Sequence, residues 1–181
     1  MLGTLFWLRS GQGGKVEAFF IWLETSSLSS WVRGETGWTM AFPVIIAFHA
    51  LGMGFLVGVA LAINARVLGA APGIPLTLLS RFLPVAMLAL VVNAISGILL
   101  LVGYPTKALT NPVFYIKLAC IALALWNLQW FSTNILGNKV YDTGAIPRRA
   151  KNLAIISTVL WAGAIVAGRL LAYTYVNLMS I

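Results

Sequence analysis

The stretch from residue 40 to residue 63 decides the fold: Met40-Ala-Phe-Pro-Val-Ile-Ile-Ala-Phe-His49-Ala-Leu-Gly52-Met53-Gly54-Phe-Leu-Val-Gly58-Val-Ala-Leu-Ala-Ile63. It contains no acidic residue, lysine or arginine, and as a helix rising about 1.5 Å per residue it can cross a hydrocarbon core of roughly 30 Å. The single histidine of the chain, His49, lies near its middle. Because an ionisable side chain is costly in hydrocarbon, His49 is a candidate functional residue.

Composition extends this interpretation to the whole chain of 181 residues, which is 60% hydrophobic and only 9% charged. Soluble domains carry about 25% charged residues, so we predict an integral membrane protein. Continuous apolar segments in lipid favour helices, and short loops favour antiparallel neighbours. We therefore predict an all-α, up-down four-helix bundle in residues 39–181, with spans at about 39–68, 82–102, 113–136 and 153–175.

Residues 1–38 are predicted to form a separate N-terminal segment that lies on the membrane surface. Aromatic residues such as Trp22 and Trp31 alternate there with glutamates and serines, a pattern typical of interfacial amphipathic helices. Ser26 or Ser27 is expected to break a first helix and to cap a second.

Basic residues predict the orientation. The chain carries a formal net charge of +8, and the loops after the first and third spans hold most of its span-flanking cations: Arg66, Arg81, Lys139, Arg148, Arg149 and Lys151. The positive-inside rule makes this side cytoplasmic and puts both termini on the periplasmic side of a bacterial inner membrane. The cations then serve topology and contact with anionic lipid, and we expect no nucleic-acid partner.

Polar residues within the spans follow steps of three and four residues, so we predict that they share one face of each helix. The first span has His49, Gly52, Met53, Leu56 and Ala60 in this pattern. The third span has Lys117, Cys120, Ala124, Asn127, Phe131 and Asn134. The fourth span has Trp161, Ile165, Arg169 and Tyr173. Three such faces could point into one interior in the outer half of the membrane.

One histidine beside small residues and two cations is the pattern of a b-type haem site. An imidazole supplies an axial ligand, and glycine leaves room for the porphyrin. Lys117 and Arg169 would pair with the propionates, because a carboxylate in a low-dielectric region needs a cation. The candidate cofactor-binding residues are His49, Gly52, Asn93, Lys117, Trp161, Arg169 and Tyr173.

A single histidine excludes a bis-histidine haem within one chain. The iron would be five-coordinate, or bound also by Met53 or Met87, or shared between two protomers. Cys120 is the one cysteine, so an intrachain disulfide and a cysteine-rich metal site are both excluded.

Each of these residues also has a simpler interpretation. His49 could hydrogen-bond a carbonyl, serine or asparagine of the next helix. Lys117 could extend its ammonium to the membrane surface without further role. Arg169 could pair with Glu35 or with a lipid. Gly54 and Gly58 have the spacing of helix-packing glycines.

Five short motifs resemble a family of small bacterial inner-membrane proteins of unknown function. They are Trp31-Val-Arg33, His49-Ala-Leu-Gly52, Asn64-Ala-Arg66-Val-Leu-Gly69, Asn111-Pro-Val-Phe-Tyr-Ile-Lys117 and Gly168-Arg169-Leu-Leu-Ala-Tyr173. The resemblance covers about residues 25–175, implies a four-helix membrane fold, and singles out His49, Arg66, Lys117 and Arg169. Two residues before Arg66, where the family pattern would have an acidic residue, this chain has Asn64. Similarity to haem-binding four-helix cytochromes and to copper-resistance membrane proteins is architectural only.

The sequence therefore predicts a membrane b-type haem protein that transfers electrons or senses a small ligand near the outer face. One alternative is a structural or accessory subunit of a larger membrane complex, without a cofactor. A further alternative is a quinone- or anion-binding carrier. No acidic residue lies within a span, and no hydrolytic set of residues is visible, so we do not expect a stand-alone enzyme. We expect a homo-oligomer packed through glycine-rich faces, with a redox partner or larger complex possible.

Overall fold

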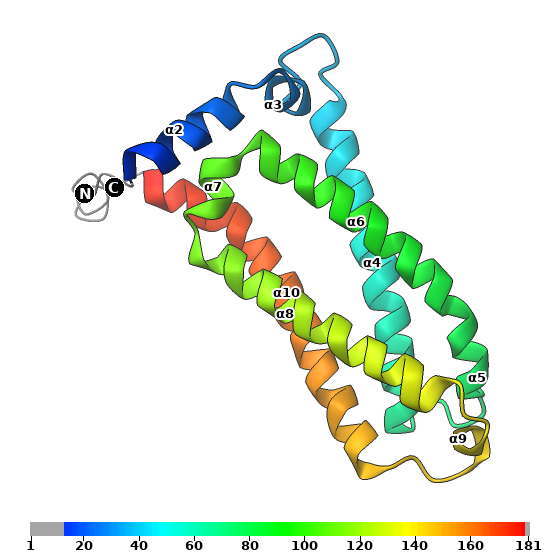
Figure 1. Cartoon of the computed structure of the whole chain (residues 1–181). Helices are drawn as coiled ribbons and strands as arrows, with labels where there is room; N and C mark the ends of the chain where they lie inside the picture. Colours follow the sequence, from blue (N-terminus) through cyan, green and yellow to red (C-terminus); the bar gives the residue numbers. More distant parts are fainter. Residues whose placement is uncertain (1–12, 180–181) are drawn as a thin grey trace.

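Helices account for all the regular secondary structure in the part of the chain described here, residues 13–179 of a computed structural model (Figure 1). Four helical segments are long and apolar enough to cross a membrane: Ala41–Leu68, Leu76–Gly103, Pro112–Leu136 and Arg148–Leu171. They agree with the predicted spans, except that the second begins about six residues earlier and the fourth about five residues earlier. The second is extended by a short helix and a 3-10 turn over residues 76–82, and the fourth by the basic stretch that begins at Arg148.

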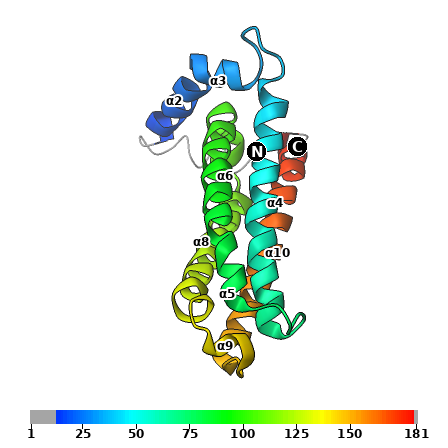
Figure 2. The ribbon, with the colours of Figure 1, turned by 90° about the vertical axis from the view of Figure 1, so that its right-hand side faces the viewer.

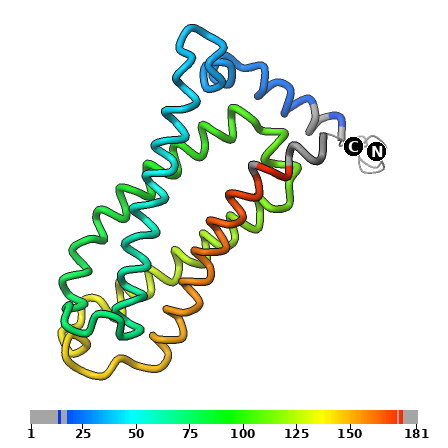
Figure 3. The backbone as a smooth tube through the Cα atoms, turned by 180° about the vertical axis from the view of Figure 1, so that it is seen from behind, coloured from blue at the N-terminus to red at the C-terminus, as the bar shows by residue number. Residues whose placement is uncertain are grey.

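The long helices form two antiparallel pairs (Figures 1 and 3). In the first pair α4 (Ala41–Leu68) packs along α6 (Leu83–Gly103), and in the second α8 (Pro112–Phe131) packs along α10 (Arg148–Met179). The two pairs meet where α4 contacts α10. A Cβ atom added at Gly52 would lie 2.9 Å from the Ala89 carbonyl oxygen and 3.0 Å from the Asn93 nitrogen, so only glycine allows α4 and α6 to approach this closely.

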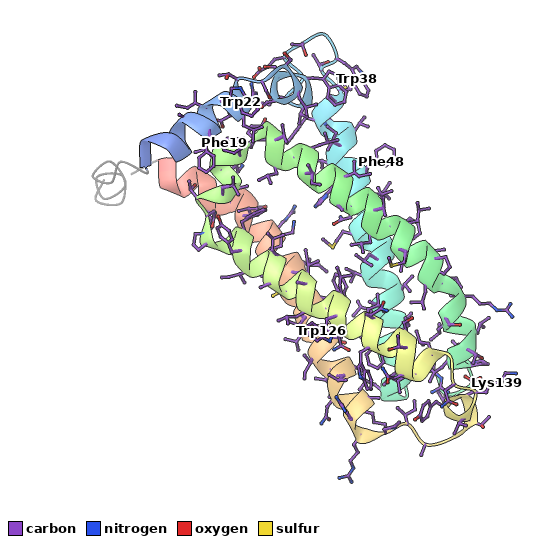
Figure 4. All side chains as sticks on the ribbon, viewed as in Figure 1. Phe19, Trp22, Trp38, Phe48, Trp126 and Lys139 are labelled. Atoms are coloured by element: carbon purple, nitrogen blue, oxygen red, sulfur yellow. The ribbon has the colours of Figure 1, made fainter. Side chains whose placement is uncertain are left out.

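The molecule has two distinct ends (Figure 2). One end, which we call the α3 end, carries α2 (Gly13–Glu24), α3 (Ser27–Val32) and α7 (Pro105–Leu109). At the opposite α5 end lie α5 (Leu76–Leu79), the 3-10 turn η1 (Ser80–Phe82) and α9 (Val140–Thr143). The labelled side chains Trp38 and Lys139 mark these two ends (Figure 4).

The largest buried side chains lie toward the α5 end. Trp161, Phe131, Leu56 and Ile63 are at most 1% exposed and belong to one apolar cluster contributed by α4, α8 and α10. Outward-facing side chains of the long helices are apolar as well, Leu88 at 66% exposed and Trp126 at 76% among them. Apolar side chains therefore occupy both the interior and the outer faces of the long helices, as expected if the outer faces contact lipid.

The predicted face of the fourth span is wrong. Trp161 is fully buried, but Ile165 is 50% exposed, Tyr173 is 60% exposed and Arg169 is also exposed. Four-residue steps advance by about 400° rather than 360°, so after three steps Tyr173 has turned roughly 120° away from Trp161. The small residues Ala154, Ser157, Ala164 and Ala167 line the buried face instead.

The predicted face of the third span is confirmed as far as Phe131. Ala124, Asn127 and Phe131 are buried, and Lys117 is half-buried. Beyond Phe131 the helix changes to a π-helical turn, η2 (Ser132–Leu136), in which Asn134 is exposed and Ile135 and Leu136 are buried. A π-helical turn holds more residues than an α-helical turn, so it rotates the residues that follow.

Hydrogen bonds join three segments at the α5 end. Arg66 is buried, and its guanidinium donates to the carbonyl oxygens of Ile74 and Asp142. The Asp142 carboxylate accepts from the Thr77 backbone nitrogen at 3.0 Å and from the Thr77 hydroxyl at 2.7 Å. These bonds lower the pKa of Asp142, with a smaller contribution from the positive charge of Arg66. Arg66, which the family resemblance singled out, therefore has a structural role here.

The N-terminal segment folds against the α3 end. As predicted, the chain breaks at Ser26, whose side chain caps α3 by accepting from the Ser29 nitrogen. Ser29 and Val32 are fully buried, and the Ser29 hydroxyl donates to the carbonyl oxygen of Gly103, the last residue of α6. A Cβ atom at Gly103 would lie 2.8 Å from the Val32 side chain, so glycine is required there too. Whether this segment lies on a membrane surface stays a prediction.

Glu35 has a different partner from one that the sequence suggested. It forms a salt bridge with Arg33 at 2.7 Å, and the hydrogen bond from Arg33 lowers the pKa of Glu35. Arg33 also donates to the Glu24 carbonyl oxygen at 2.9 Å, which ties α2 to the loop after α3. The predicted alternative of an Arg169–Glu35 pair is therefore wrong.

Candidate functional site

His49 lies on α4 where that helix packs against α6. It is half-buried, and its Nδ1 atom is 3.1 Å from the Asn93 carbonyl oxygen and 3.0 Å from the Ser96 hydroxyl. In return, the Asn93 side-chain amide donates to the His49 carbonyl oxygen at 2.8 Å. A Cβ atom at Gly97 would lie only 3.2 Å from His49 Cε1, so the absence of a side chain there makes room for the ring. The imidazole is therefore held on two sides by α6.

These bonds define which ring nitrogen carries the proton. A carbonyl oxygen can only accept, so the contact with Asn93 requires a hydrogen on Nδ1. The Ser96 hydroxyl can accept from the same N–H because it donates its own hydrogen to the Val92 or Asn93 carbonyl. Nε2 of the neutral ring then carries the free lone pair, and it has no hydrogen-bond partner among the described residues. This arrangement prepares Nε2 to bind a metal or to accept a proton.

Lys117 brings a positive charge to the same region from α8. Its ammonium is close enough to act electrostatically on the His49 ring. Its stem packs beside Gly168 of α10, where a Cβ atom would lie 3.6 Å from Lys117 Cε. His49 and Asn93 thus mark a contact of α4 with α6, about 12 Å along α4 from its start at the α3 end, and Lys117 and Gly168 mark a contact of α8 with α10.

Three of the predicted site residues do not join this region. Arg169 is exposed and stacks over the Tyr173 ring at 5.8 Å, so this pair lies outside the helix contacts. Trp161 is fully buried close to Thr158, which contacts Asn64 on α4. Since Asn64 lies roughly 22 Å along α4 from His49, Trp161 is too far down the molecule to reach the imidazole.

Gly52 also has a different role from the predicted one. The backbone of α6 occupies the space beside it, so Gly52 is a helix-packing residue and leaves no room for a flat ligand. By contrast, Gly54 and Gly58 have nothing within 4 Å of an added Cβ atom and lie on the outward surface of α4. The interpretation of Gly54 and Gly58 as helix-packing residues therefore has no partner within the described chain.

Neither methionine considered as a second iron ligand is placed to act as one. Met53 follows His49 by one turn on the same face of α4, so both side chains approach from one side and cannot enclose a porphyrin plane. Met87 is 56% exposed and lines a groove toward the α5 end with Leu125, Gln129 and other side chains of α6 and α8.

Ser96 and Gly97 are the site residues that the sequence did not single out as binding residues. Ser96 follows Asn93 by three residues on an apolar helix, so both face one neighbour, and this spacing was a usable signal. Nothing in the sequence identifies Gly97 as the glycine beside the histidine ring. Among the described residues no group of three or more His, Cys, Asp or Glu side chains could hold a metal ion, so His49 is the candidate ligand by itself.

Comparison with known proteins finds no matching protein-family model, no similar curated protein and no similar solved structure. The resemblance described above therefore stays a prediction.

Proposed function

We propose that the chain inserts in a bacterial cytoplasmic membrane as a four-helix bundle and binds one haem b through Nε2 of His49. The observation that carries the proposal is the hydrogen bond from His49 Nδ1 to the Asn93 carbonyl oxygen at 3.1 Å. Axial and metal-binding histidines commonly donate the other ring N–H to a carbonyl, which fixes the ring orientation and increases its basicity.

Lys117 supports the proposal as the partner of a haem propionate. It is half-buried on α8, and an ammonium partly removed from water is stabilised by a nearby anion. Arg169 drops out of this role because it is exposed and stacks on Tyr173. The proposal therefore has one cation for the propionates instead of the two that the sequence suggested.

Neither Met53 nor Met87 is positioned as a second ligand, so His49 is the ligand that this chain would supply to a haem iron. Haem b held there would supply one-electron exchange or a binding position for a small ligand. The residues of the chain orient the imidazole through Asn93 and Ser96 and keep its Nε2 lone pair free.

The test is a reduced-minus-oxidised absorption spectrum of the detergent-purified protein, as isolated and after addition of haemin. We expect a Soret and an α band in the wild type, and their loss in His49→Ala, with partial recovery when free imidazole is added. Asn64→Ala is the matched control, because it also removes one polar side chain of α4 with a single bond to another helix. A colourless wild type after haemin addition, or an unchanged spectrum in His49→Ala, contradicts the proposal.

A colourless protein that co-purifies with other chains would favour the accessory-subunit alternative. One observation suits that alternative: Phe19 and Trp22 on α2 are 52% and 65% exposed, at the α3 end. Such aromatic side chains can contact either a partner protein or the lipid surface. The absorption spectrum tests for haem directly, and its result does not depend on whether α2 contacts a partner protein or the lipid surface.

A further inference from the structure

A second candidate site lies at the other end of the molecule, in an apolar groove of about 400 Å³ between α8 and α10. Leu123 and Trp126 line it from α8, and Ile156 and Leu160 line it from α10. Its lining residues on α10 extend from Arg149 to Leu160, roughly 16 Å along the helix axis. Volumes of this order suit a small organic molecule.

A buried acceptor without a partner belongs to the lining of this groove. Asn127 is 6% exposed, and its side-chain nitrogen donates to the Leu153 carbonyl oxygen at 2.8 Å. That bond fixes the orientation of the amide, because the carbonyl can accept only from the nitrogen. Asn127 Oδ1 is then a buried acceptor that has no hydrogen-bond partner among the described residues. Leaving such an atom unpaired is costly, so the groove favours an occupant with a donor.

The mouth of the groove carries an aromatic ring and a cation. Arg149, the second residue of α10, stacks its guanidinium over the Trp130 ring at 5.4 Å. Trp126 lies on α8 beside α10 and is 76% exposed, so its ring is free to pack on a flat ligand (Figure 4). The groove thus combines an apolar channel, two indole rings, donors at its mouth and one acceptor inside.

We propose that this groove binds a hydroquinone with an apolar tail, the reduced form of a membrane quinone. Its ring hydroxyl donates to Asn127 Oδ1, its ring packs against Trp126, and its tail lies along Leu123, Ile156 and Leu160. A phospholipid fits less well, because the ester oxygens next to its acyl chains only accept, and the donors of its headgroup lie beyond the phosphate. The oxidised quinone has the same limitation, so the site prefers the reduced form. This site is independent of the proposed haem at His49.

The test measures binding of decylubiquinol and of decylubiquinone to the protein in phosphatidylcholine nanodiscs, corrected for partition into empty nanodiscs. We expect the wild type to bind the quinol about tenfold more tightly than the quinone, the effect of one hydrogen bond to a buried acceptor. Asn127→Leu should remove this preference. Asn134→Leu is the matched control, since Asn134 is an exposed asparagine of the same span that does not line the groove.

Trp126→Ala keeps the test decisive if Asn127→Leu fails to fold, because the exposed Trp126 ring contributes little packing. It should weaken binding of both forms several-fold through lost ring contact. His49→Ala should change neither affinity, which separates this site from the haem proposal. Equal or tighter binding of the quinone by the wild type overturns the proposal, as does wild-type affinity in Trp126→Ala. Displacement of the quinol by phosphatidylglycerol in the nanodiscs would assign the groove to anionic lipid instead.

Discussion

At the scale of single residues, short contacts between helix backbones decide where the candidate site forms. Gly52 allows α4 to lie against Ala89 and Asn93 of α6, and this close approach brings the Asn93 carbonyl to His49. A glycine in a helix interior is unfavourable by up to about 1 kcal/mol relative to alanine, so its presence needs such a packing reason. Gly97 makes a comparable space for the histidine ring itself.

Gly52→Ala is predicted to lower the free energy of unfolding by about 1–3 kcal/mol, the usual cost of overpacking against backbone that cannot move aside. The added Cβ atom would meet the Ala89 oxygen at 2.9 Å. Gly54→Ala is the matched control two residues further along α4. Nothing lies within 4 Å of its Cβ position, and alanine has the higher helix propensity, so this substitution should not lower the free energy of unfolding. Thermal unfolding in detergent measures both, and equal effects of the two substitutions would contradict this account.

At the scale of elements, hydrogen bonds from polar side chains connect the ends of the helices at the α5 end. Asp142 connects α9 to the start of α5 through two hydrogen bonds from Thr77, and Arg66 connects the end of α4 to the same loop. These bonds fix how the two helix pairs are joined at the α5 end. The two bonds from Thr77 go to the Asp142 carboxylate and lower its pKa, so they favour the ionised form.

This network predicts a loss of stability in acid. A carboxyl group with a lowered pKa in the folded state stabilises that state above its unfolded pKa of about 3.9, and the stabilisation is lost as the pH falls through the folded pKa. We therefore expect the difference in melting temperature between the wild type and Asp142→Asn to shrink as the pH is lowered from 6 to 3. Glu35 also has a lowered pKa but is present in both proteins, so its contribution cancels. A difference that is constant with pH would contradict this role of Asp142.

At the scale of the whole molecule, the two ends differ in charge and in the segments that cover them. The α3 end carries α2, α3 and the Arg33–Glu35 pair, whereas the α5 end carries Arg66, Lys139 and Arg149. The positive-inside rule applied to this arrangement predicts that the α5 end faces the cytoplasm. Outward-facing Gly54 and Gly58 on α4 remain the surface on which a second copy of the chain is expected.

The orientation can be measured by cysteine labelling in a Cys120→Ser background, because Cys120 is the single natural cysteine. A membrane-impermeant maleimide added to intact spheroplasts should label Trp38→Cys, which lies at the α3 end, and should spare Lys139→Cys at the α5 end (Figure 4). After lysis both positions should react. Labelling of Lys139→Cys in intact cells would reverse the proposed orientation.

The sequence by itself determined the four long helices, their approximate bounds and the break at Ser26. These features depend on residues that are consecutive in the sequence: a continuous apolar run for each long helix, and a capping side chain for the break. Only the tertiary structure decided which polar residues meet. Rotation accumulates along a helix, so Arg169 and Tyr173 turned outward although their spacing from Trp161 suggested otherwise. The packing of the helices against one another decided the remaining contacts. It placed α6 in the space beside Gly52, oriented His49 through Asn93, and left Asn127 Oδ1 without a hydrogen-bond partner among the described residues.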